Sequence, residues 1–349
     1  LLSRRQRQMC IRDSYNMADS IFIGHGVGPL AISGLALTFP LMNLAAAFGS
    51  LVGVGASTLV SVKLGQKDYE GANKVLGNVL VLNVVLGLAF TLVFMLLLDP
   101  ILYFFGASEN TILYARDYMN VILIGNVITH MYLGLNAVLR SSGFPKLAMY
   151  ATLASVVINC VLNPLFIFGF GWGIKGSAWA TVISQVISLT GQLIHFSRPK
   201  ELLHFKKGIY RLKSEIVKGI LYIGMSPFLM NLCACLIVIL INRGLKEHGG
   251  DMAIGAYGIV NRVVFLFIMI IMGFNQGMQP IAGYNFGARQ YSRVTEVTKL
   301  TMKWAIGVAT TGFLLCQLFP SVIVRMFTTD PELIEAAVYG LHIVFAVFP

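Results

Sequence analysis

Charged side chains are scarce in this sequence. Only 12% of its 349 residues are Asp, Glu, Lys or Arg, whereas a typical soluble domain carries roughly 25%. Hydrophobic residues make up 56% of the chain and the mean hydropathy is +0.76. This balance excludes an ordinary soluble globular protein and indicates an all-α polytopic membrane protein whose surroundings are a lipid bilayer.

Signatures of catalysis and of metal binding are also missing. The sequence has five cysteines, and all of them but Cys10 lie in apolar runs, which argues against a disulfide framework. Cys233 and Cys235 are two residues apart and would face different ways on a helix, which argues against a metal pair. No HExxH motif, GxSxG motif or cluster of His and Asp occurs in the apolar runs. The sequence therefore predicts neither an enzyme nor a cofactor.

Acidic residues number 15 against 26 basic ones, which gives a formal net charge of +11. This excess does not predict nucleic-acid binding, because the Lys and Arg residues lie mainly in short loops between apolar runs. The loops expected on one side of the membrane carry 16 basic residues, and those expected on the other side carry five. The positive-inside rule then places the first set, and the start of the chain, in the cytoplasm. We expect a multi-pass protein of the cell inner (plasma) membrane.

Apolar runs long enough to cross a bilayer recur along the chain. A spanning helix needs about 20 apolar residues, and the candidates are 30–62, 75–98, 114–138, 147–169, 176–196, 217–241, 253–285 and 298–320. Half-spans lie at 15–24 and 333–349. Proline inside a helix removes a backbone hydrogen bond, so we expect kinks at Pro40, Pro164, Pro227 and Pro280.

The two ends of the sequence do not complete this pattern. Residues 1–14 carry four Arg and no periodic apolar face, and the last residues stop inside an apolar run. We interpret residues 1–14 as a non-native segment and expect the chain to be cut at both ends.

The chain also contains an internal repeat. A shift of 222 residues places Gly55 on Gly277, and it likewise places Gly65 on Gly287. In both copies an overlong apolar run ends in a glycine and a basic loop follows. Six spans separate equivalent points, so both halves should have the same orientation, with a pseudo-two-fold axis along the membrane normal. The predicted lobes are 15–196 and 217–349, and the cytoplasmic linker between them is 197–216.

Asp19 is the only acidic residue inside an apolar span. An intramembrane carboxylate costs several kcal/mol unless it is paired or faces a wet cavity, so it is a functional hypothesis by default. A position near the outer interface is the alternative. Asn159 and Asn163 share one helix face, and Thr181 follows on the next helix. Their oxygens could orient a carboxylate or bind a hard cation, or they could simply join two helices.

Five segments of the chain, in order, resemble the MATE (multidrug and toxic compound extrusion) family. They are YNMADSIFIGHGVGPLAISGLA, GVGASTLVSVKLGQKDYEGA, LRSSGFPKLAMY, INCVLNPLFIFGFGWGIKGSAWATVISQ and GFNQGMQPIAGYNFGA. The resemblance implies twelve helices in two six-helix lobes. This chain would then hold part of helix 1, helices 2 to 9 and part of helix 10. It also implies a monomer that exports small organic compounds, cationic ones above all, by antiport with H⁺ or Na⁺.

The resemblance also implies where the coupling ion acts. In one branch of the family an N-lobe cation site uses motif positions that fall on Asp19, Asn159, Asn163 and Thr181 here. That branch often has Asp at the position of Asn163, so this chain keeps a single carboxylate. A single acid slightly favours H⁺, although Na⁺ at Asp19, Asn159 and Thr181 stays open.

The resemblance further implies a central cavity for small drugs or metabolites, lined by helices 1, 2, 7 and 8. The candidate lining residues are Pro40, Asn275, Gln276, Met278 and Gln279. The alternative function is that of a lipid-linked sugar or polysaccharide flippase in the same wider superfamily. A pyrophosphate carrier would need several cationic residues along the cavity, and the apolar runs contain few.

Overall fold

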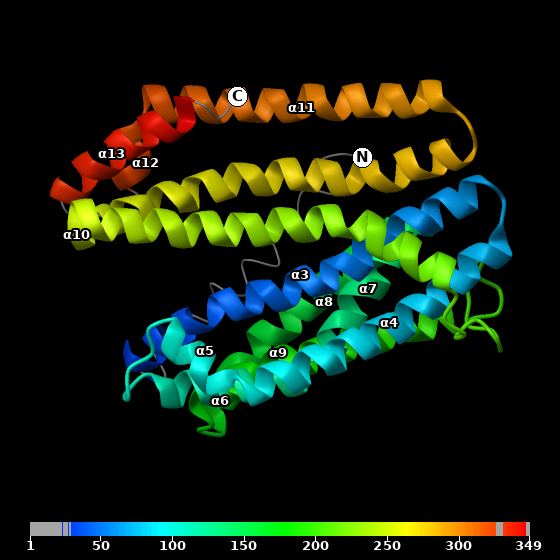
Figure 1. Ribbon diagram of the computed structural model, residues 1–349, viewed down its shortest axis with the longest axis horizontal. Coiled ribbons are helices and arrows are strands. Elements are labelled where there is room, and N and C mark those ends of the chain that lie inside the picture. Colours follow the sequence, from blue (N-terminus) through cyan, green and yellow to red (C-terminus); the bar gives the residue numbers. More distant parts are fainter. Residues whose placement is uncertain (1–22, 24–26, 28, 326–330, 347–349) are drawn as a thin grey trace. The chain divides into compact units, whose positions relative to one another are not determined.

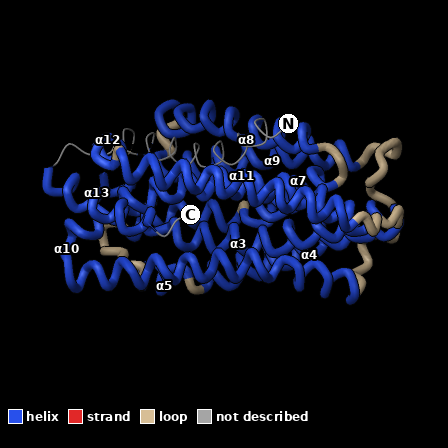
Figure 2. The backbone as a smooth tube through the Cα atoms, turned by 90° about the horizontal axis from the view of Figure 1, so that it is seen from above, coloured by secondary structure: helices blue, strands red, loops and turns tan. Residues whose placement is uncertain are grey.

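The computed structural model describes residues 23, 27, 29–325 and 331–346, and within these ranges every regular element is a helix (Figures 1 and 2). The predicted all-α class is therefore confirmed. The chain divides into two compact units. The larger unit holds the described residues up to Leu232 together with Gly283–Tyr291. The smaller unit holds Cys233–Ala282 and the described residues from Ser292 onward.

The larger unit contains most of the helices. They are α3 (Pro29–Gly65), α4 (Tyr69–Leu96), α5 (Leu98–Phe104), α6 (Ile112–Ile124), α7 (Asn126–Ser141), α8 (Pro145–Pro164), a π-helix η1 (Leu165–Gly169) and α9 (Gly173–Phe196). Helix α10 (Ser214–Gly287) contributes to both units. The remaining helices are α11 (Tyr291–Leu318), α12 (Pro320–Arg325) and α13 (Pro331–Ala346). The lobe boundaries expected from the sequence stay a prediction.

Several helices are long and apolar enough to cross a membrane. In the described part of the chain these are Leu37–Gly65, Tyr69–Leu96, Pro145–Gly169, Ser214–Ala234 and Ala256–Gly287, with α6 and α7 together as a sixth, bent candidate. Both spans expected at 217–241 and 253–285 fall within α10, whose ribbon turns back on itself (Figure 1). Helices α9 and α11 coincide with expected spans but are not in this set, because both carry many polar side chains.

The span expected at 114–138 differs from the prediction. It is broken at Gly125 into α6 and α7, which meet at 54°. A Cβ atom at Gly125 would lie 2.4 Å from Cγ2 of Val182 on α9. The break and the missing side chain together let this region approach α9 closely. The prolines expected to kink helices have different effects on secondary structure. Helix α3 continues through Pro40, whereas α8 ends at Pro164 and the π-helix follows.

The turns that end the two repeats have the same conformation. Helix α3 ends at Gly65 and α10 ends at Gly287, 222 residues later. Two residues after each glycine comes a non-glycine residue with positive φ, Lys67 at 59° and Arg289 at 58°. The backbone hydrogen bonds also correspond: Lys67 N to Leu64 O, Asp68 N to Lys63 O, Arg289 N to Phe286 O and Gln290 N to Asn285 O. The internal repeat is thus confirmed at these two turns.

The segment between α9 and α10 is tied to the side of α4. We call residues 197–213 the linker. Asn73 donates from Nδ2 to Leu202 O (3.3 Å) and accepts from His204 N (2.9 Å). Asn78 donates to Arg211 O (3.2 Å) and accepts from Lys213 N (3.0 Å). Each asparagine therefore binds the linker backbone through both its side-chain nitrogen, which donates, and its side-chain oxygen, which accepts.

Candidate cation-coupling site

Three of the predicted site residues lie together in the larger unit. Asn159 on α8 donates from Nδ2 to Oγ1 of Thr181 on α9 (3.1 Å), and Asn163 donates from Nδ2 to Oδ1 of Asn159 (3.1 Å). Their exposed fractions are 1%, 4% and 0% for Asn159, Thr181 and Asn163. We call these three residues the coupling cluster. Spacing alone placed the two asparagines on one face, and the structure adds the threonine from the next helix.

The chain between α8 and α9 allows this contact by turning tightly. Gly171 and Gly173 have positive φ values of 67° and 56°, a region that glycine adopts without steric cost. The GWGIKG segment therefore brings α9 back along α8.

Further polar groups adjoin the cluster from three helices. Ser184 Oγ donates to Thr181 O (2.8 Å), and Ser155 Oγ on α8 donates to Ser184 Oγ (3.4 Å). Thr129 on α7 donates to Oε1 of Gln185 (2.5 Å). The cluster is thus one part of a larger buried polar region shared by α7, α8 and α9.

The chemistry of the cluster is that of neutral oxygens and amide donors. Such groups can orient a carboxylate by hydrogen bonding, or they can supply some of the oxygen ligands of a hard cation. In the described residues, no group of three or more His, Cys, Asp or Glu side chains could hold a metal ion. Asp19 lies outside the described residues, so its place beside the cluster stays a prediction.

The residues predicted to line a substrate cavity are divided between the two units. Pro40 lies half-buried on α3 in the larger unit. Gln276, Met278 and Gln279 are half-buried and Asn275 is exposed, all on the part of α10 in the smaller unit. Their common cavity stays a prediction.

The sequence interpretation missed the polar residues of α9 beyond Thr181. Ser184, Gln185, Ser188 and Gln192 are all buried, with at most 7% of each exposed. A signal was present, because polar residues recur there every three or four positions in an otherwise apolar helix.

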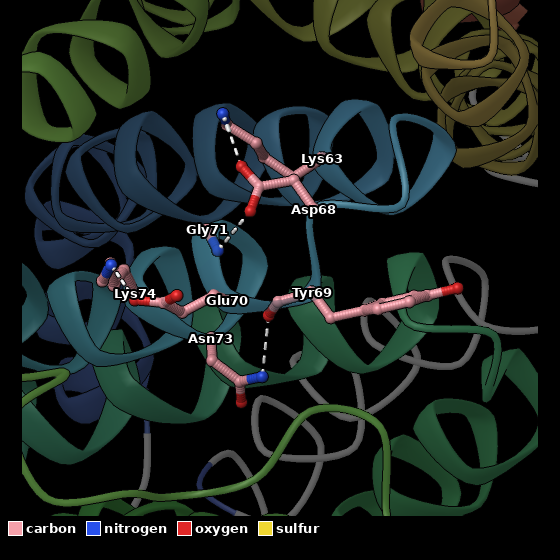
Figure 3. A network of polar contacts seen from close by, with 7 residues as sticks. All are labelled: Lys63, Asp68, Tyr69, Glu70, Gly71, Asn73 and Lys74. Carbon is pink, nitrogen blue, oxygen red and sulfur yellow. Dashed lines mark hydrogen bonds and ion pairs between the residues drawn. The ribbon is translucent and has the colours of Figure 1, made fainter.

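A second polar network lies at the turn between α3 and α4 (Figure 3). Asp68 accepts from Gly71 N (2.8 Å) and pairs with Lys63 Nζ (2.9 Å), and Glu70 in the first turn of α4 pairs with Lys74 one turn later. The hydrogen bond from Lys63 is the main reason that the pKa of Asp68 lies below its ordinary value, with the Gly71 amide next. This network caps α4 and fixes the turn.

Comparison with known proteins agrees with the architecture. The MatE family model matches residues 8–165 and 223–349. The multidrug export protein MepA of Staphylococcus aureus (strain N315) is 31% identical over 336 residues, which is 95% of this chain and 73% of MepA. MepA of Staphylococcus haemolyticus (strain JCSC1435) is 31% identical over 94% of this chain and 72% of that protein.

Solved structures of MATE proteins also resemble this chain. A crystal structure of MATE in the bent conformation matches with a TM-score of 0.91 and 25% identity, covering 97% of this chain and 75% of that one. A MATE complex with MaD3S matches with a TM-score of 0.88 at 25% identity, over 98% of this chain and 76% of that one. The family model, the relatives and the shared all-α polytopic fold establish that this chain belongs to the MATE family of efflux transporters.

Proposed function

We propose that this protein exports small organic compounds, cationic ones above all, across the inner membrane in exchange for H⁺ or Na⁺. Two observations support the proposal. Relatives 31% identical over 94–95% of the chain are multidrug export proteins. The coupling cluster is buried and joined by hydrogen bonds at the positions where the family resemblance implies a cation site.

The proposed mechanism follows from Asp19 being the one acid inside the apolar spans. A lone carboxylate in an apolar setting can be neutralised by a proton, a metal cation or a cationic substrate. A second positive charge beside an already neutralised site gains little in a low-dielectric interior. Binding of the coupling ion and of the drug is then mutually exclusive, which is the requirement for antiport.

The coupling cluster would act on this carboxylate. Amide donors of Asn159 and Asn163 stabilise the ionised form, and the Thr181 hydroxyl can donate or accept. We favour H⁺ slightly over Na⁺, because the position of Asn163 provides no second carboxylate. We further propose a monomer without cofactor, with its N-terminal end in the cytoplasm, as the bias of loop charge indicates.

The decisive experiment is Asp19→Asn in the full-length protein. The amide resembles the protonated acid in shape but cannot ionise, so we expect normal insertion and no energised efflux. Dye efflux is measured in everted vesicles with imposed pH or sodium gradients, and the gradient that drives wild-type efflux identifies the ion.

Asp117→Asn is the matched control. Asp117 forms an exposed ion pair with Lys175 (3.2 Å), and such pairs contribute little to stability. We expect efflux at the wild-type rate in this variant. If Asp19→Asn also pumps at the wild-type rate under both gradients, the proposed coupling site is wrong.

A further inference from the structure

Helix α9 has a stripe of buried polar side chains along one face. We call these residues the polar stripe: Ser177, Thr181, Ser184, Ser188 and Gln192. They recur every three or four residues, which places them on the same side of a helix. None is more than 4% exposed. At about 1.5 Å per residue, the stripe extends about 16 Å from Thr181 to Gln192. It therefore connects the coupling cluster with the last turn of α9.

Two members of the stripe, Thr181 and Ser184, are satisfied by protein groups. Thr181 accepts from Asn159, and Ser184 bonds both Thr181 O and Ser155. The other three members are not. Ser177 Oγ, Ser188 Oγ and both Nε2 and Oε1 of Gln192 are buried and form no hydrogen bond with any described protein group. Roughly nine in ten buried polar groups in proteins have a partner, so a whole unpaired amide in this setting indicates a partner other than protein.

The neighbouring helices add polar groups at the same level. The Asn159–Thr181 and Ser155–Ser184 contacts show that α8 runs antiparallel to α9, which places Thr152 level with Ser188. Helix α7 is antiparallel to α8, so it runs parallel to α9. The contact between Thr129 and Gln185 then places Asn136 level with Gln192.

Asn136 and Thr152 are themselves connected. Asn136 Nδ2 donates to Ala148 O (3.0 Å) and to Thr152 Oγ1 (3.4 Å). The unpaired groups of α9 thus lie at the level where α7 and α8 also contribute polar side chains, and buried water needs polar partners of this kind.

We propose that the polar stripe holds a file of ordered water molecules, along which a proton passes between the coupling cluster and the end of α9 near His195. Successive members of the stripe, such as Ser184 and Ser188, are about 6 Å apart along the helix axis. That separation is too long for a direct hydrogen bond and fits one bridging water. The proposal rests on the proposed antiport function and adds the route of the ion.

The direction of the route follows from the linker. His195 lies in the last turn of α9, and the linker that follows contains six basic residues, Arg198, Lys200, Lys206, Lys207, Arg211 and Lys213. Basic loops lie on the cytoplasmic side. The file therefore gives the coupling cluster access to the cytoplasm through the larger unit itself.

The first test is a high-resolution experimental structure of the full-length protein. We expect water density within hydrogen-bond distance of the Gln192 amide and the Ser188 hydroxyl. The proposal is overturned if both side chains bond only protein groups or if the space beside them is dry. This result does not depend on transport, so it is independent of the proposed function.

The second test is transport by Gln192→Leu, which removes the amide and keeps an apolar side chain of similar size. We expect the rate of efflux driven by an imposed pH gradient to fall about tenfold, the effect of losing one hydrogen bond of roughly 1.4 kcal/mol. Binding of the drug at equilibrium should not change. Thr190→Val is the matched control, because Thr190 is exposed on the same helix and bonds only Val186 O in the structure.

If Gln192→Leu does not insert, Ser188→Ala replaces it with a smaller change, and the same slowing is expected. Wild-type rates in the inserted Gln192→Leu or Ser188→Ala variant would overturn the water file. If Asp19→Asn still abolishes efflux in that case, the proposed function stands and only the route is wrong.

Discussion

Gly65 and Gly287 each lie against the other's helix, and the contact is reciprocal. A Cβ atom on Gly65 would lie 2.0 Å from Tyr284 O, and one on Gly287 would lie 2.1 Å from Val62 O. Val62 and Tyr284 are themselves 222 residues apart in the sequence. The ends of the two repeats therefore meet as equivalent surfaces, in the manner of an isologous two-fold interface.

Gly65→Ala should destabilise this crossing. The added methyl would overlap a backbone oxygen, which cannot move aside as a flexible side chain can. Overpacking of this kind typically costs about 1–3 kcal/mol. The melting temperature of the purified full-length protein measures the effect, and Gly287→Ala should behave alike because the contact is reciprocal.

Gly191→Ala is the control for that prediction. Gly191 lies on α9, and a Cβ atom there would meet nothing within 4 Å. Alanine in an open helical position is favoured over glycine by about 0.5–1 kcal/mol, so this variant should be at least as stable as wild type. Equal melting temperatures for Gly65→Ala and Gly191→Ala would contradict the close contact.

Asn78→Ala should release the linker from α4. Asn78 is fully buried and bonds the backbone at Arg211 and Lys213. The substitution leaves those groups unpaired, at a cost of about 1–3 kcal/mol. We expect trypsin to cleave at Lys206, Lys207 or Arg211 at least several times faster. Asn231→Ala, at an exposed asparagine that bonds only Pro227 O in its own helix, should leave the cleavage rate unchanged.

Asn159 and Thr181 should show energetic coupling in a double-mutant cycle. Asn159→Ala and Thr181→Ala each remove one partner of the same hydrogen bond, so the double variant should lose about 0.5–1.5 kcal/mol less than the sum of the single losses. The cycle is measured as the free energy of unfolding of the full-length protein and its variants. Both single variants should also weaken coupled efflux less than Asp19→Asn does. Strict additivity would show that the two side chains act independently.

The pH dependence of stability should include a contribution from Asp68. The pKa of this carboxyl is lowered in the folded protein, chiefly by the hydrogen bond from Lys63. A lowered pKa means that the stabilisation is complete above the ordinary value of 3.8 and is lost as pH falls through the folded value. Asp68→Asn keeps a capping oxygen but no charge. We expect it to be less stable than wild type near neutral pH, and the difference should shrink in acid.

Much of the architecture was predictable from local patterns. Apolar runs predicted the positions of the long helices, because a helix satisfies all its backbone hydrogen bonds within one apolar segment of the bilayer. The 222-residue shift predicted that Gly65 and Gly287 end equivalent helices. Spacing also put Asn159 and Asn163 on one face.

Other features depended on contacts between residues distant in sequence. The 54° break at Gly125 is matched to Val182 on another helix, so no local pattern could predict it. The same is true of the linker bonds made by Asn73 and Asn78. Composition could show that α9 is unusually polar, but only packing shows that its polar face is buried.

The amino-acid sequence alone therefore specified a helical membrane protein, the internal repeat and the candidate polar residues. Hydropathy, spacing and loop charge are local quantities, and each can be evaluated without a fold. The tertiary structure was needed to join Asn159 to Thr181 and to show that Gln192 has no partner among the described protein groups. Hydrogen bonding between helices depends on their register and separation, which are fixed only when side chains from the whole unit pack together.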